Sequence, residues 1–187
     1  MIVIGDRDKK IKEFLEVVGC ADTNTIAAIF FPRTCIRNTQ KRLKQLVDYK
    51  FIKVYRPNML TQNIYYSKNK PRNIKHKILF SQLLGELHRQ QVEILKYKCP
   101  YKLENIIADG LIVTRTNNQI GIYFVEGEIS KKLNVKKYED SYYSNKWKEV
   151  FPIFPTILVI TDKRIKTDHK HLKIKKCKLD LSDLRLD

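Results

Sequence analysis

The sequence predicts a protein of the α+β / α/β class with two domains. Three runs of apolar residues at helical spacing come first, and two strand-like runs with a Pro-Asn turn signal between them follow. After the polar, basic stretch "SKNKPRNIKHK", the pattern continues as a helix, three strands, a helix and a strand. We therefore expect one domain over residues 1–70 and a second over residues 71–187.

The first two helices follow from apolar spacing and from residues that start or stop a helix. The run "DRDKKIKEFLEVVG" has Asp6 or Asp8 as its cap and Gly19 as its stop. The run "TNTIAAIFF" is expected to be capped by Thr23 or Thr25 and is followed by a proline. Both runs predict short amphipathic helices.

The third helix, in "TCIRNTQKRLKQLVDYK", has a basic face rich in hydrogen-bond donors. Its inner face is expected to hold Ile36, Leu43, Leu46 and Val47. Three short helices followed by a hairpin describe a winged helix-turn-helix, whose third helix has the size and charge to enter a major groove. The predicted DNA contacts are Arg33, Thr34, Arg37, Asn38, Lys41, Lys44, Lys53 and Arg56.

These contacts divide by chemistry. Arg37 and Asn38 have the geometry to bind guanine and adenine edges, whereas Lys41, Lys44 and the hairpin cations suit phosphates. The alternative is that this basic face is simply solvated. The formal net charge of +17 and the sequence pI of about 9.7 favour a polyanionic partner, because neutralising phosphates releases condensed counterions.

Other classes have weaker support in the sequence. The apolar runs are far shorter than the roughly 20 residues that span a bilayer, so we expect a cytoplasmic protein without a membrane partner. The four cysteines form no C-x-x-C pair, which argues against a zinc knuckle. Aromatic residues in "KKYEDSYYSNKWKE" are able to stack on exposed bases, although Tyr138 and Trp147 are expected to pack in the interior.

Three carboxylates mark the second domain. If Asn117 and Asn118 form a two-residue turn, Thr116 pairs with Gln119, and counting back pairs Asp109 with Glu126 on one sheet face. Glu128 then shares that face. Such a cluster requires a divalent metal held by Asp109 and Glu126, or an Arg or Lys from a neighbouring helix.

These residues resemble the PD-(D/E)xK nuclease core, a restriction-endonuclease-like α-β-β-β-α-β domain. The resemblance implies Mg²⁺ or Mn²⁺ at Asp109 and Glu126, but Glu128 stands where a catalytic Lys belongs, and Ala108 replaces the Pro. Lys131, Lys132 or Lys136 would have to substitute for that Lys, and Glu86 would be a further ligand. The resemblance therefore implies a domain that is expected to be inactive, with no cofactor.

The whole chain looks like a member of the replication-relaxation family of plasmids, phages and conjugative elements. The resemblance rests on "RLKQLVDYKFIKVYR", "ADGLIV", "FVEGE" and "LNVKKY". It implies a double-stranded DNA-binding protein of a mobile element that regulates transcription or assists replication or transfer. A homodimer is expected, and a replication or transfer protein is a further candidate partner. The alternatives are a metal-dependent nuclease and a pure protein-interaction module.

Overall fold

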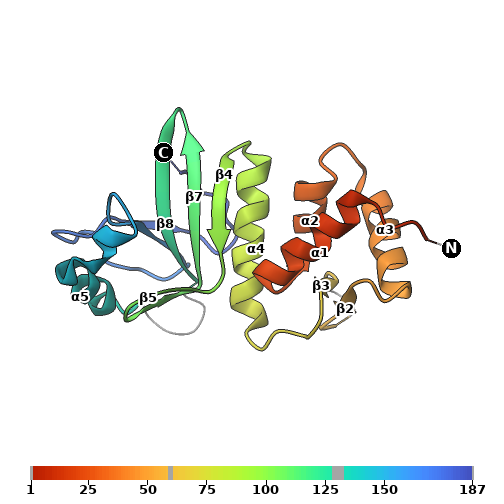
Figure 1. Cartoon of the computed structure of the whole chain (residues 1–187), viewed down its shortest axis with the longest axis horizontal. Coiled ribbons are helices and arrows are strands. Elements are labelled where there is room, and N and C mark those ends of the chain that lie inside the picture. Colours follow the sequence, from red (N-terminus) through yellow and green to blue (C-terminus); the bar gives the residue numbers. More distant parts are fainter. Residues whose placement is uncertain (1, 59–60, 128–132, 187) are drawn as a thin grey trace. The chain divides into compact units, whose positions relative to one another are not determined.

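The computed structural model describes residues 2–58, 61–127 and 133–186, which have a mixed α+β fold (Figure 1). The chain divides between Gln91 and Val92 into two compact units, and each is described here by itself. The first unit contains α1 (Asp6–Val18), β1 (Ala21–Asp22), α2 (Thr23–Phe30), α3 (Ile36–Asp48), β2 (Lys53–Tyr55), β3 (Ile64–Tyr66) and α4 (Ile74–Arg89).

The second unit is built mainly from strands. It contains β4 (Glu93–Lys98), β5 (Tyr101–Leu103), β6 (Ile106–Ala108), β7 (Gly110–Thr116), β8 (Gln119–Gly127), α5 (Lys136–Ser144), the short 3-10 helix η1 (Lys146–Glu149), β9 (Thr156–Ile160) and β10 (Ile174–Cys177). Within the described ranges, no helix of either unit is long and apolar enough to cross a membrane.

Helices α1 and α2 form where the apolar spacing predicts them, but other residues cap them. The cap of α1 is Gly5, and the Asp8 carboxylate accepts a hydrogen bond from the Gly5 N–H at 2.8 Å. The cap of α2 is Asp22, whose carboxylate accepts from the Thr25 N–H at 2.7 Å, so the expected cap at Thr23 or Thr25 is wrong. Gly19 ends α1 at φ 88°, as predicted.

The three helices are followed by the predicted hairpin, which belongs to a three-stranded antiparallel sheet. Strands β2 and β3 pair with Val54 opposite Tyr65, and β1 pairs with the other edge of β3. Strand β1 has two residues, which is too short to give a periodic signal in the sequence. Its pairing ties the start of α2 to the hairpin.

Helix α4 belongs to the first unit, although we expected the boundary near residue 70. Its apolar face packs on α2 and β1, and Gln82 donates a hydrogen bond to the Asp22 carboxylate at 2.7 Å. Gly85 favours this packing, since a Cβ there would approach Thr25 Cγ2 to 3.3 Å, which is a tight contact. The apolar spacing of α4 predicts the helix but not the unit on which it packs. Figure 1 shows α3 and α4 on opposite sides of α1 within this unit.

The second unit is organised around a five-stranded mixed sheet in the order β10-β9-β8-β7-β4. Strand β7 pairs antiparallel with both of its neighbours, β4 and β8, whereas β9 pairs parallel with both of its neighbours, β8 and β10. Thr116 pairs with Gln119 across the predicted Asn turn, where Asn117 and Asn118 have φ values of 48° and 61°. The register that we derived from the turn is therefore confirmed.

Two elements of this unit differ from the prediction. The expected strand over residues 105–116 is divided at Asp109 into β6, which pairs with β5, and β7, which joins the main sheet. Helix α5 begins at Lys136 with Val135 as its cap, and the expected cap, Ser130, lies outside the described residues. Tyr138 and Trp147 are buried against Phe124 and its neighbours, as expected.

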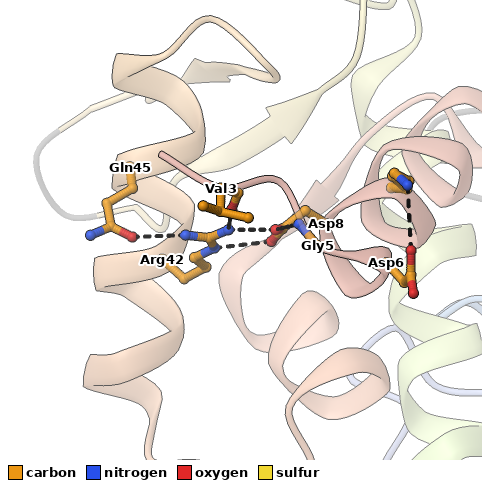
Figure 2. Close-up of polar contacts among 7 residues, drawn as sticks. Val3, Gly5, Asp6, Asp8, Arg42 and Gln45 are labelled. Carbon is orange, nitrogen blue, oxygen red and sulfur yellow. Dashed lines mark hydrogen bonds and ion pairs between the residues drawn. The ribbon is translucent and has the colours of Figure 1, made fainter. Parts of the chain in front are cut away.

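A buried ion pair joins α3 to α1 in the first unit (Figure 2). The Arg42 guanidinium donates to both oxygens of Asp8, from Nε at 3.0 Å and from the terminal NH2 group at 2.5 Å. The same NH2 group donates to the Val3 carbonyl at 2.8 Å, and NH1 donates to Gln45 Oε1 at 3.2 Å. The Asp8 side chain is only 5% exposed, so this bidentate pair is largely shielded from water.

The ion pair determines the ionisation of Asp8. Burial acts to raise the pKa of the Asp8 carboxyl, but hydrogen bonds from Arg42 and the Gly5 N–H outweigh burial and lower it below its ordinary value. The hydrogen bond to Asp8 raises the pKa of Arg42 in turn. Both groups are therefore charged at neutral pH, and each compensates the other.

We predict that Arg42→Ala lowers the free energy of unfolding of the first unit by about 3 kcal/mol, because it leaves the Asp8 carboxylate buried without its cation. Urea denaturation followed by far-ultraviolet circular dichroism measures the effect. The matched control is Arg37→Ala on the exposed face of the same helix, which should change stability by less than about 0.5 kcal/mol. Equal stability of the two variants would contradict the role given to this pair.

Candidate nucleic-acid interface

Helix α3 presents a polar, basic face to solvent. Its apolar side buries Leu43 and Leu46. Arg37, Asn38 and Lys41 are all exposed, one helical turn or less apart. Ile36, which we expected on the inner side, is 43% exposed, so it belongs to the edge of this face.

Lys44 lies on the same side of α3 but already has an anionic partner. Its ammonium lies 2.7 Å from the Asp48 carboxylate, one turn further along the helix. Both side chains are more than half exposed, and such surface pairs contribute less than about 1 kcal/mol. Lys44 is therefore available to another anion, while Asp48 reduces the positive potential at this end of the helix.

The two predicted hairpin cations contact the backbone near the hairpin. Lys53 Nζ donates to the Lys68 carbonyl at 2.7 Å, and Arg56 Nε donates to the Thr61 carbonyl at 3.3 Å. Both side chains are exposed. Because the carbonyls carry no net charge, these contacts hold the two cations in place without neutralising them.

Arg33 and Thr34 lie in the turn between α2 and α3, at a groove of about 730 Å³. His88 and Arg89, at the end of α4, line the same groove. Arg89 is also paired with Glu86 at 2.6 Å, so Glu86 has a partner within the first unit. The groove joins two of the predicted contacts to basic residues from a helix that we had assigned to the other domain.

A second basic hollow lies at residues 67–77, which we had expected to be only a linker. This hollow of about 480 Å³ is lined by Lys68, Lys70, Arg72 and Lys77, with Glu16 as its acidic member. A signal was present in the sequence, since no Asp or Glu occurs between Asp48 and Glu86. Such a long stretch without acidic residues is typical of a surface that faces an anion.

The carboxylates of the second unit meet where β7 begins and β8 ends. The register pairs Gly110 with Val125, which places Asp109 beside Glu126. Asp109 Oδ2 accepts a hydrogen bond from the Gly127 N–H at 2.8 Å. Two carboxylates so close to each other require compensation.

Lys137 of α5 supplies that compensation. Its ammonium lies 2.5 Å from Glu126 Oε1 and donates to the Ile107 carbonyl at 2.9 Å. The Tyr138 hydroxyl donates to the same Glu126 oxygen at 2.5 Å. Burial raises the pKa of Tyr138 most, and the negative charges of Glu126 and Asp109 raise it further, so the phenol keeps its proton. We had expected a lysine or a metal at this point, and we had considered Lys131, Lys132 and Lys136 rather than Lys137.

The fit of a divalent metal to Asp109 and Glu126 is limited by these contacts. One of the two carboxylate oxygens of Glu126, Oε1, already accepts from an ammonium and a hydroxyl. Among the described residues, no three His, Cys, Asp or Glu side chains are grouped so that they would hold a metal ion. Glu128, Lys131 and Lys132 lie outside the described residues, and Lys136 is exposed.

Comparisons with known protein families, with curated proteins and with solved structures find no match to this chain.

We predict that Lys137→Ala lowers the free energy of unfolding of the second unit by about 2 kcal/mol, because Glu126 loses its cation in a site that is 15% exposed. Fluorescence of Trp147, the single tryptophan of the chain, reports unfolding of this unit. The control is Lys136→Ala, which removes the neighbouring, exposed lysine and should have little effect. The role of Lys137 is refuted if both variants unfold at the same urea concentration.

Proposed function

We propose that the protein binds double-stranded DNA through a winged helix-turn-helix in which α3 enters the major groove and the β2–β3 hairpin is the wing. The observation that carries the proposal is the exposed face of Arg37, Asn38 and Lys41 on a helix whose other side is fixed to α1 by the Arg42 pair. A helix that reads base edges must be held rigidly while its outer face remains open, and α3 meets both conditions.

The predicted contacts have different tasks in this proposal. Arg37 and Asn38 read base edges, because their side chains donate and accept in the patterns that guanine and adenine present. Lys41, Lys44, Lys53 and Arg56 bind phosphates, which orient the protein without reading sequence. Arg33 and Thr34, which line the protein groove at the α2–α3 turn, contact the DNA backbone in this proposal.

The second unit, in this proposal, is a nuclease-like domain that no longer cuts DNA. The support is the placement of Asp109 and Glu126 at the ends of adjacent strands and the pairing of Glu126 with a lysine. Such a domain would orient two copies of the winged helix on half-sites about one helical turn apart, as dimeric readers do. We propose a transcriptional regulator or a replication or transfer accessory factor of a mobile element.

We predict that Arg37→Ala and Asn38→Ala each weaken specific binding by about 1 to 3 kcal/mol, because each removes a base contact. Lys53→Ala should weaken binding to all sequences alike and reduce its salt dependence, since it removes a phosphate contact. Gel shifts with a selected site and with unrelated duplex DNA at several salt concentrations measure both effects. If all three variants bind like the wild type, α3 is not the reading helix.

A metal-dependent nuclease is the second candidate, because the Lys137 ammonium stands beside Glu126 and provides the cation that is missing from position 128. We expect no nicking of supercoiled plasmid with Mg²⁺ or Mn²⁺, since an ammonium and a hydroxyl already bind Glu126 Oε1 and compete with a metal ion for this carboxylate. Nicking that is lost in both Asp109→Asn and Glu126→Gln, which preserve side-chain shape, would establish the nuclease instead. The Lys136→Ala protein, which keeps the cluster intact, is the control.

A further inference from the structure

The second unit carries a stack of aromatic rings that leads from its core to its surface. Trp147 is buried, and its ring stacks on Tyr142 with centroids 6.0 Å apart and planes at 19°. Tyr142 in turn stacks on His171 at 5.4 Å and 13°. The three rings are therefore nearly parallel, with the buried tryptophan at one end and the exposed histidine at the other.

The stack is held from several sides. Trp147 Nε1 donates a hydrogen bond to the Tyr142 carbonyl at 3.0 Å. The ring of Phe154 packs edge-on against both Trp147 and Tyr142, with centroids 5.4 Å away in each case. The inner two rings are thus fixed in orientation, and they fix the plane of His171. A preorganised aromatic surface loses little entropy when it binds a flat ligand.

Tyr143 lies beside the outer pair of rings, with its ring centroid 5.6 Å from that of Tyr142 and nearly perpendicular to it. Its ring lies 5.6 Å from His171 and nearly perpendicular to it, and it is 63% exposed. A hollow of about 60 Å³ lies here, lined by Tyr142, Tyr143, His171, Lys170, Leu172 and Glu139. Large aromatic side chains on a surface are a marker of binding sites, because water solvates them poorly.

The chain around His171 is strongly basic. From Lys163 to Lys178 the only acidic residue is Asp168, and the flanking Lys170 and Lys173 are exposed. Glu139, the acid that lines the hollow, lies 3.6 Å from His169 Nδ1. An aromatic surface flanked by lysines attracts a ligand that combines flat rings with negative charge.

We infer that this surface binds single-stranded nucleic acid, with an unpaired base stacked on His171 and its edge against Tyr143, and with the adjoining phosphates on Lys170 and Lys173. The face of α3 that we propose to bind duplex DNA does not offer such a contact, because Arg37, Asn38 and Lys41 expose charged and amide groups there. The inference is independent of the proposed function, because it rests on residues of the second unit and not on α3.

The test measures binding of the full chain to a fluorescently labelled oligothymidine strand by fluorescence anisotropy. Oligothymidine stays single-stranded, because it contains no base that pairs with thymine. We expect His171→Ala to weaken binding about tenfold, the loss typical of one stacked base, and His171→Phe to retain most of the affinity. Tyr143→Ala should also weaken binding, whereas Arg37→Ala should not. Duplex gel shifts with the His171 variants should match the wild type.

Three results would overturn the inference. The first is wild-type affinity of both the His171→Ala and Tyr143→Ala proteins for the strand. The second is an equal loss in Arg37→Ala, which would place the strand on α3. The third is equally tight binding of polyglutamate, which would mean that charge alone drives the association. If the wild type does not bind duplex DNA, but His171→Ala weakens binding of the single strand as expected, the winged-helix proposal is refuted. The inference about single-stranded nucleic acid then still holds.

Discussion

The bidentate pair between Arg42 and Asp8 is the contact on which the arrangement of the first unit depends. Asp8 also holds the Gly5 N–H at the start of α1, so one carboxylate both begins a helix and anchors the third helix to it. Removing either partner leaves a charge in a poorly hydrated place, which makes the pair effective at fixing a single geometry. The exposed side of α3 is oriented because its inner side is constrained in this way.

A second pair solves the same physical problem in the second unit. Glu126 ends a central strand, where water does not compensate its charge fully, and Lys137 and Tyr138 reach it from α5. These two side chains compensate the charge of Glu126 beside Asp109, so the pair of carboxylates does not require a metal. In each unit, a carboxylate that is shielded from water is thus paired with a basic side chain, while many other basic side chains face solvent and produce the positive surface.

Local patterns predicted most of the elements. Apolar spacing located α1, α2, α3 and α4, and the Asn turn fixed the register of β7 and β8 to the residue. The errors lie where two arrangements compete for the same residues. Asp22 takes the cap of α2 from the threonines that follow it, and β6 leaves the main sheet to pair with β5. Apolar spacing does not distinguish between neighbouring capping residues, and it does not show which strand a short run will join.

The sequence by itself determined the α+β class, the excess of positive charge, the basic outer face of α3 and the proximity of Asp109 to Glu126, because each depends on spacing along a helix or across one turn. Only the tertiary structure decided that α4 packs on α2, that Arg42 is an internal anchor rather than a surface cation, and that Lys137 is the lysine that meets Glu126. An apolar face or a long charged side chain specifies what kind of partner it needs, and the three-dimensional fold specifies which one it reaches.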